Sequence, residues 1–97
     1  MKIYIAGKIA GDPGHKEKFA AYTRKIEENG DIALNPATIP DGLPVADCMR
    51  ICFAMIDAAD TVLFLPDWKQ SGGAQLEKAY CDYIGKPYQI QKEEVEK

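Results

Sequence analysis

The stretch that decides the fold is Thr61–Glu77, TVLFLPDWKQSGGAQLE. Its first part, Thr61–Leu65, is an unbroken apolar run that ends at Pro66, and such a run is typical of a parallel strand covered on both faces. A short loop follows, and Ser71 is a residue type that commonly caps the start of a helix. The sequence therefore predicts a buried strand, a loop and a helix in direct succession.

The start of this helix predicts an anion site. Gly72 and Gly73 come directly after Ser71, and glycines leave the first backbone N–H groups open to a close neighbour. A helix N-terminus also carries roughly half a positive charge, which favours a phosphate. Glu77 lies about a turn and a half further along the helix, so a carboxylate is expected beside the phosphate donors.

The composition is that of one ordinary globular domain spanning residues 1–97. Of its 97 residues, 46% are hydrophobic and 28% are charged. The net charge of −3, without a basic stripe, argues against binding to a nucleic-acid polymer. No apolar run is long enough to cross a membrane and no signal-peptide pattern is present. The three cysteines, an odd number, indicate reduced thiols and hence the cytoplasm.

Apolar periodicity and turn residues predict four strands and three helices. The expected strands are Lys2–Ala6, Ile32–Leu34, Thr61–Leu65 and Pro87–Ile90. The expected helices are His15–Asn29, Val45–Ala59 and Ser71–Ile84, and a charged tail, Gln91–Lys97, ends the chain. The side chains expected to face the sheet are Phe19, Tyr22 and Ile26, then Met49, Cys52, Phe53 and Ile56, then Leu76, Ala79, Tyr80 and Tyr83.

This alternation of strands and helices predicts an α/β, three-layer, flavodoxin- or Rossmann-like fold. Right-handed crossovers then favour a parallel sheet of order 2-1-3-4 with helices on both faces. In such a sheet the strand order reverses between strands Lys2–Ala6 and Thr61–Leu65, and ligands bind beyond the carboxyl ends of strands at that point. The topology therefore brings together the two glycine-bearing loops, Gly7–Gly14 and Pro66–Gly73.

Several loop residues have a functional and a structural interpretation. The loop Gly7–Gly14 fits neither the dinucleotide fingerprint nor the Walker P-loop, so it contacts a ligand phosphate through its backbone or is an ordinary turn. Lys8 and Lys69 flank the expected crevice, where they hold an anion or are simply solvated. Trp68 either stacks on a nucleobase or packs over the edge of the sheet.

Glu77 and Tyr4 likewise have two interpretations each. A glutamate on a helix is most often solvated, and a tyrosine in a strand most often belongs to the core. Beside apolar Leu65 and Trp68, however, the carboxylate of Glu77 would lose water and its pKa would rise. A carboxylate placed in this way can attack an anomeric carbon, and Tyr4 would then orient it.

The sequence predicts neither a metal site nor a cofactor. Cys48 and Cys52 lie one helical turn apart, but zinc needs two further ligands at suitable spacing, and only Cys81 and His15 remain. Buried thiols are therefore expected. His15, at the start of a helix, is expected on the surface rather than in catalysis.

Four short motifs resemble the nucleoside 2-deoxyribosyltransferase superfamily. They are Tyr4-Ile-Ala-Gly7, Ala59-Asp60 before an apolar strand, Ser71-x-Gly73-x-x-x-Glu77, and Gly85-Lys86-Pro87. The serine six residues before the glutamate is more similar to the 2′-deoxynucleoside 5′-phosphate N-hydrolases than to the transferases. The chain also resembles small uncharacterised bacterial and phage proteins near that superfamily.

The resemblance implies a role for each matching residue. Glu77 would be the nucleophile that attacks C1′ of the sugar and releases the base, and Tyr4 would hydrogen-bond its carboxylate. Gly7, Ser71 and Gly73 would line the pocket for the sugar and the 5′-phosphate. Members of the family are commonly oligomeric, so a homodimer or higher homo-oligomer is expected, with a small nucleoside or nucleotide as ligand.

Two positions depart from the pattern of the family. Cys52 stands where the family places an aspartic acid that helps the base to leave, so Asp47 or Asp67 takes over that role or the step is weak. Lys8 and Ala10 stand where the phosphate-specific hydrolases have a serine and an arginine, and Lys8 lacks the fork of a guanidinium.

Three functions therefore compete. The first is cleavage of the N-glycosidic bond of a nucleoside or nucleoside 5′-monophosphate, or transfer of its deoxyribose, through Glu77. The second is nucleotide binding without turnover, as a sensor or sequestering protein, and the third is a scaffold that only oligomerises. The residues expected to bind the substrate are Gly7, Lys8, Asp67, Trp68, Ser71, Gly72 and Gly73.

Overall fold

The computed structural model describes residues 1–92, and the last five residues of the expected charged tail lie outside the described residues. The elements follow in the order β1 (Lys2–Ala6), α1 (His15–Glu28), β2 (Ile32–Leu34), α2 (Val45–Ala58), β3 (Thr61–Phe64), α3 (Gly72–Ile84) and β4 (Tyr88–Ile90). Two 3-10 turns that the sequence did not predict, η1 (Pro36–Thr38) and η2 (Trp68–Gln70), interrupt the loops after β2 and β3. No helix within residues 1–92 has the length and apolar character needed to cross a membrane.

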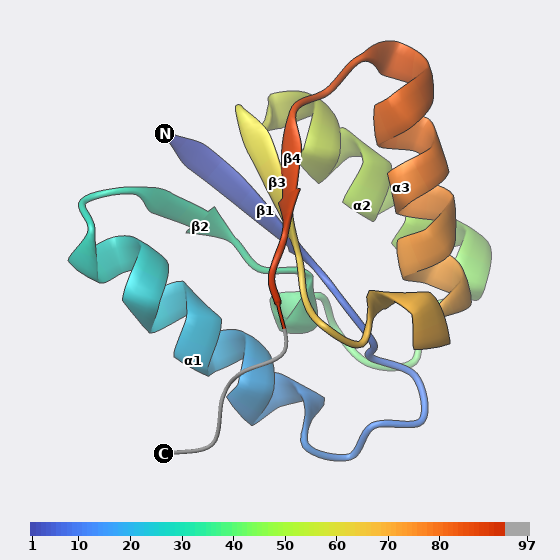
Figure 1. Cartoon of the computed structure of the whole chain (residues 1–97). Coiled ribbons are helices and arrows are strands. Elements are labelled where there is room, and N and C mark those ends of the chain that lie inside the picture. The colour runs from blue at the N-terminus through green and yellow to red at the C-terminus, as the bar shows by residue number, and fades with distance from the viewer. Residues whose placement is uncertain (93–97) are drawn as a thin grey trace.

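The four strands form one parallel sheet of order β2-β1-β3-β4, which confirms the predicted α/β fold. Tyr4 at the middle of β1 lies opposite Leu34 of β2 and Val62 of β3. Figure 1 shows α1 on one face of the sheet and α2 and α3 on the other, the arrangement that right-handed crossovers require. The strand order therefore reverses between β1 and β3, as predicted.

The alternation of side chains along β1 divides the core into two layers. Tyr4 and Ala6 point toward α2 and α3, where they join Ile56, Phe64 and Cys81. Ile5 points the other way and packs with Phe19, Ile26 and Leu65 beneath α1. Leu65 lies one residue beyond β3, and its backbone N–H still donates to the carbonyl of Ala6 at 2.8 Å. The two glycine-bearing loops thus leave the sheet side by side.

The predicted buried face of α3 is wrong except at Tyr80, which is partly buried and packs against the core. Leu76 is 58% exposed and Tyr83 is 92% exposed, whereas the side chains that face the sheet are those of Ala74, Glu77 and Cys81. Both sets recur at helical spacing, so periodicity alone did not separate them. On this side of α3, Cys81 packs in the core cluster with Phe64, and the carboxylate of Glu77 accepts a hydrogen bond from the hydroxyl of Tyr4.

The two ends of α3 have local causes. Ser71 is the N-cap, and its Oγ accepts a hydrogen bond from the backbone N–H of Ala74 at 3.1 Å. Gly85 ends the helix with φ of 75°, a left-handed conformation that favours glycine. These two caps set the position of the turn that carries Glu77.

Candidate functional site

A cavity of about 420 Å³ lies beyond the carboxyl ends of β1 and β3. Its walls come from the loop after β1, the first residue of α1, the segment 36–45, and the N-terminal halves of α2 and α3. The place is the strand-order reversal that the topology predicts, and the volume lies within the usual range for small-molecule sites. The wall formed by residues 36–45 was not predicted, because a proline-rich loop has no periodicity that would place it.

Glu77 and Tyr4 form a buried pair at this cavity. Glu77 is 5% exposed, and its Oε2 accepts a hydrogen bond from the phenolic O–H of Tyr4 at 2.9 Å. Both residues line the cavity, so the carboxylate is shielded from bulk water but lies within reach of a ligand. The structure therefore brings together on the cavity wall a carboxylate and a hydroxyl that donates to it.

Burial changes the acidity of this pair. It raises the pKa of Glu77 from 4.5 to about 7, and hydrogen bonds from Tyr4 and Cys52 offset only part of the rise. Burial and the charge of Glu77 also hold the pKa of Tyr4 well above its usual value, so Tyr4 remains a hydrogen-bond donor. Near neutral pH the carboxylate is therefore divided between its protonated and ionised forms.

Cys52 lines the cavity beside this pair. It stands where the superfamily that the sequence motifs resemble has an aspartic acid. Burial, the largest cause, raises the pKa of Cys52 to about 11, and the charge of Glu77 adds to the rise. A thiol of this kind holds its proton at neutral pH and hydrogen-bonds to its neighbours. It is a poor source of a proton for a departing base.

Gly7, Ser71 and Gly73 also line the cavity. A Cβ built on Gly7 would lie 2.8 Å from Cδ1 of Leu65, so only glycine allows the loop to pass this close to the end of β3. A Cβ on Gly73 would lie 3.6 Å from Sδ of Met49, which is an ordinary contact. Gly73 therefore keeps its side of the cavity open, whereas Gly7 is needed for backbone packing.

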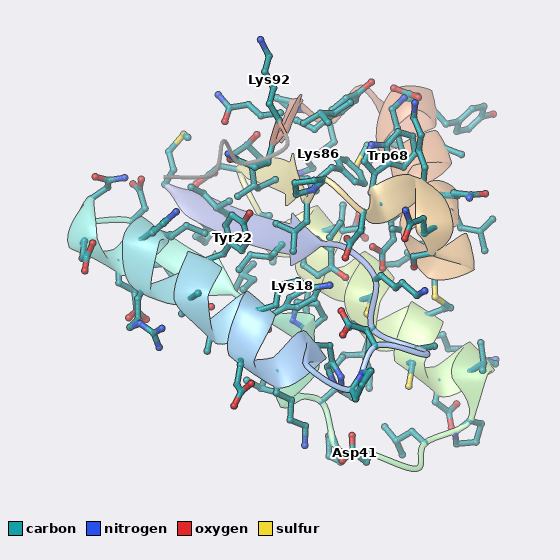
Figure 2. The ribbon with its side chains drawn as sticks, turned by 60° about the horizontal axis from the view of Figure 1, so that its bottom comes forward. Lys18, Tyr22, Asp41, Trp68, Lys86 and Lys92 are labelled. Atoms are coloured by element: carbon teal, nitrogen blue, oxygen red, sulfur yellow. The ribbon has the colours of Figure 1, made fainter. Side chains whose placement is uncertain are left out.

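The other expected binding residues, Lys8, Asp67, Trp68 and Gly72, are not among the residues that line the cavity. Asp67 accepts a hydrogen bond from the backbone N–H of Lys8 at 3.1 Å and forms an ion pair with Lys18 at 2.5 Å. Figure 2 shows Lys18 extending from α1 toward these loops. Asp67 thus ties the loops together rather than facing a ligand.

Trp68 packs over the edge of the sheet, the structural one of its two interpretations. Its ring meets Phe64 edge to face at a centroid distance of 5.7 Å. In Figure 2 it lies beside the first turns of α3, far from Asp41 on the segment 36–45. The ammonium groups of Lys69 and Lys78 lie over the same ring at 5.8 and 5.5 Å, so Lys69 also has an observed contact outside the cavity.

Neither aspartate considered as a substitute acid lines the cavity. Asp47 is paired with the guanidinium of Arg50 at 3.0 Å on the outer side of α2. Asp67 is held by Lys18 as described above. The acid that is absent at position 52 is therefore not replaced by either of these two residues.

Three titratable residues that the sequence did not place at the site do line the cavity, His15, Asp41 and Cys48. Asp41 lies on the segment 36–45 and pairs with Lys16 at 3.1 Å. Nδ1 of His15 lies 2.9 Å from the carbonyl oxygen of Asp12. Only the position of His15 directly after the first glycine-bearing loop hinted at this, because no motif includes it. Within residues 1–92, no cluster of three or more His, Cys, Asp or Glu residues is arranged to hold a metal ion.

Comparison with known proteins relates both the sequence and the fold to others. The domain family of unknown function DUF4406 matches residues 1–89, and no curated protein matches the chain significantly. The solved structure of a 2-desoxiribosyltransferase from Leishmania mexicana superposes with a TM-score of 0.77 at 17% identity. The match covers 97% of this chain and 65% of that protein, so the chain spans about two thirds of its length. The fold is therefore that of a deoxyribosyltransferase, and by sequence the chain belongs to the DUF4406 family.

Proposed function

We propose that this protein cleaves the N-glycosidic bond of a nucleoside or nucleoside 5′-monophosphate, with Glu77 as the nucleophile. The observation that carries this proposal is the buried Tyr4–Glu77 pair on a cavity at the strand-order reversal. The likeness in fold to a deoxyribosyltransferase supports it. The ionised carboxylate attacks C1′ of the sugar, the base departs, and the resulting ester is resolved by water or, in a transfer reaction, by a second base.

The rest of the lining supports binding of the sugar. The donors at the start of α3, beside Ser71 and Gly73, suit a sugar hydroxyl or a 5′-phosphate. Gly7 allows the backbone of the first loop to approach the same place. Most of the remaining wall is apolar, which suits the face of a nucleobase.

A second candidate is a binding module that holds a nucleotide without turning it over. Cys52 is the specific observation in its favour, because a thiol with a pKa of about 11 does not assist a departing base. In this case the protein acts as a sensor or a sequestering protein. Its cavity would then need the same ligand contacts but no nucleophile.

Assembly and location complete the proposal. Large apolar side chains are exposed on α2 and α3, and we propose that they are buried in a homodimer or higher homo-oligomer. They are Val45, Ile51, Leu76, Tyr83 and Ile84. Cys48, Cys52 and Cys81 are free thiols, which supports a reducing compartment such as the cytoplasm.

The test is base release. The protein is incubated with nucleosides and their 5′-monophosphates, with and without an acceptor base, and free base is measured by chromatography. We expect release by the wild-type protein and none by Glu77→Gln, which retains the shape of the side chain without its charge. No release from any compound, together with a rise in melting temperature with one of them, would establish the binding module instead.

A further inference from the structure

The geometry points to His15 as the group that gives a proton to the departing base, a role that rests on the proposed function. His15 lies on the wall of the cavity that holds Glu77, and no motif of the sequence assigns it a function. His15, on α1, would thus supply the proton that the thiol of Cys52, on α2, does not supply to the departing base.

The orientation of the imidazole ring is defined by the loop that precedes α1. Nδ1 lies 2.9 Å from the carbonyl oxygen of Asp12, and because a carbonyl can only accept, Nδ1 carries a hydrogen atom. Asp12 is itself held by Lys18 at 2.6 Å and by the backbone N–H of Gly14 at 3.0 Å. Nε2 is therefore the ring atom that exchanges a proton with a ligand.

His15 and Glu77 reach the cavity from opposite layers of the molecule. His15 is the first residue of α1, whereas Glu77 lies on α3, and Figure 1 shows these helices on opposite faces of the sheet. Cleavage of a glycosidic bond needs two groups that flank the bond, one at the anomeric carbon and one at the leaving group. His15 and Glu77 both line the cavity, so a nucleoside bound there meets one group from each layer.

The other titratable residues on the cavity wall are less suited to this step. The side chain of Asp41 is 76% exposed and pairs with Lys16, and Sγ of Cys48 donates to the carbonyl of Leu43, so both have partners of their own. Tyr4 already donates to Glu77, and the thiol of Cys52 has a pKa of about 11. Imidazole is the side chain that most often transfers protons in enzymes.

The reaction balances with these two groups and one water molecule. A carboxylate oxygen of Glu77 bonds to C1′ while the bond from C1′ to the base nitrogen breaks, and its electron pair leaves with the base. The imidazolium of His15 gives its Nε2 proton to the base, which departs neutral. Neutral His15 then takes a proton from the water that attacks C1′, and cleavage of the ester restores both the Glu77 carboxylate and the imidazolium.

The experiment compares leaving groups that do and do not need a proton. His15→Asn is the main variant, because its side-chain amide can still donate to the carbonyl of Asp12. Base release is measured from 2′-deoxyadenosine, 2′-deoxyguanosine, 2′-deoxycytidine and thymidine, each with and without a 5′-phosphate. Release of nitrophenolate from 4-nitrophenyl 2-deoxyribofuranoside, free and 5′-phosphorylated, is measured in parallel, because nitrophenolate departs without protonation. His15→Gln serves as a second variant if His15→Asn does not fold.

We expect His15→Asn to lower base release by about 10²–10⁴-fold and nitrophenolate release by less than about 3-fold. Glu17→Gln is the matched control, since it removes a charge from an exposed residue of the same helical turn outside the cavity wall, and both rates should be unchanged. Glu77→Gln should lose both activities. Equal losses with both leaving groups, or no loss, would overturn the role of His15 while leaving the proposed function intact. If the wild-type protein is inactive on every compound, the proposed function is refuted, and so is the role of His15 as proton donor.

Discussion

Glu77 is a carboxylate that burial and hydrogen bonding affect in opposite directions. Removal from water favours its neutral form, whereas the hydroxyl of Tyr4 at 2.9 Å favours the charged one. Burial is the larger effect, so the pKa settles at about 7. This pKa sets the contribution of Glu77 to the pH dependence of stability, and it sets the pH range in which Glu77 is ionised and able to act as the proposed nucleophile.

The first prediction concerns stability. Between pH 4.5, the usual pKa, and about 7 the folded state binds more protons than the unfolded state, so stability falls as pH rises through that window. The cost of the buried charge is complete above pH 7 and amounts to about 3 kcal/mol at most. Glu77→Gln should therefore match the wild-type pH trend below pH 4.5 and be the more stable protein at pH 8. Urea unfolding at pH 4, 6 and 8 measures this, and a difference between the two proteins that does not change with pH would contradict it.

The second prediction concerns the rate. Because the proposed nucleophile is the ionised carboxylate, kcat/KM for nitrophenolate release, which needs no proton from His15, should rise with pH to a plateau, with a midpoint near 7. Tyr4→Phe removes the hydrogen bond that favours the charged form, so the midpoint should move to higher pH. A pH profile of both proteins on the same compound measures the shift. An unchanged or lower midpoint would show that Tyr4 does not act on the charge of Glu77.

At the scale of elements, the two loops that border the cavity are joined through one lysine. Nζ of Lys18 lies 2.6 Å from Asp12, 2.5 Å from Asp67 and 3.0 Å from the carbonyl oxygen of Lys8. Burial lowers the pKa of Lys18, but the hydrogen bonds to the two aspartates outweigh it and leave the pKa raised. The lysine is therefore charged, and it holds the loop after β1 against the loop after β3.

The third prediction tests this junction. Lys18→Met keeps the aliphatic stem but leaves two half-buried carboxylates without their partner, and it should lower the free energy of unfolding by about 1–3 kcal/mol. Lys16→Met is the control, because its ion pair with Asp41 is exposed and such pairs contribute about 0–1 kcal/mol. Urea unfolding midpoints of the two variants measure this difference. Equal decreases in the free energy of unfolding would show that the contacts of Lys18 with the two loops do not stabilise the protein.

The fourth prediction separates the two glycines of the cavity wall. Gly7→Ala places a methyl group 2.8 Å from Leu65, and it should cost about 1–3 kcal/mol through overpacking. Gly73→Ala meets Met49 at an ordinary distance within a helix, so the fold should keep or gain stability while the cavity narrows. Thermal melts measure both effects, and a Gly7→Ala protein as stable as the wild type would show that the loop has room to move.

At the scale of the whole molecule, large apolar side chains on the outer surface of α2 and α3 are exposed in a single chain. Leu76 and Tyr83 share one side of α3, and Val45 and Ile51 are exposed on the neighbouring α2. Scattered apolar residues are normal on a surface, but with Ile84 there are five large ones on two adjacent helices of so small a protein, which favours burial in a subunit interface.

The fifth prediction is that Leu76→Glu converts the oligomer into a monomer. A charge placed inside an apolar interface would have to be buried without a partner, and this cost opposes association. Light scattering coupled to size-exclusion chromatography gives the mass of the wild type, of Leu76→Glu and of the control Gln89→Glu on exposed β4. A wild-type protein that is already monomeric at micromolar concentration would refute the proposed assembly.

Much of the fold and part of the site follow from the sequence by itself. Short-range patterns determined the strand and helix boundaries to within a residue, because apolar runs, capping residues and glycines act on their own neighbourhood. Chain order and right-handed crossovers then determined the strand order and hence the edge at which the cavity opens. For that reason Gly7, Ser71 and Gly73 could be placed near one another, whereas the pairing of Tyr4 with Glu77 was one of two interpretations that the sequence left open.

Only the tertiary structure decided which surfaces meet. It turned Glu77 inward, where the hydroxyl of Tyr4 donates to its carboxylate, and Tyr83 outward on the same helix. It brought His15 and Asp41 to the cavity. Asp67 and Trp68 lie outside it, because Asp67 is paired with Lys18 and the ring of Trp68 packs on Phe64. Such choices depend on contacts between residues far apart in the chain, and these contacts have no periodic signature in the sequence.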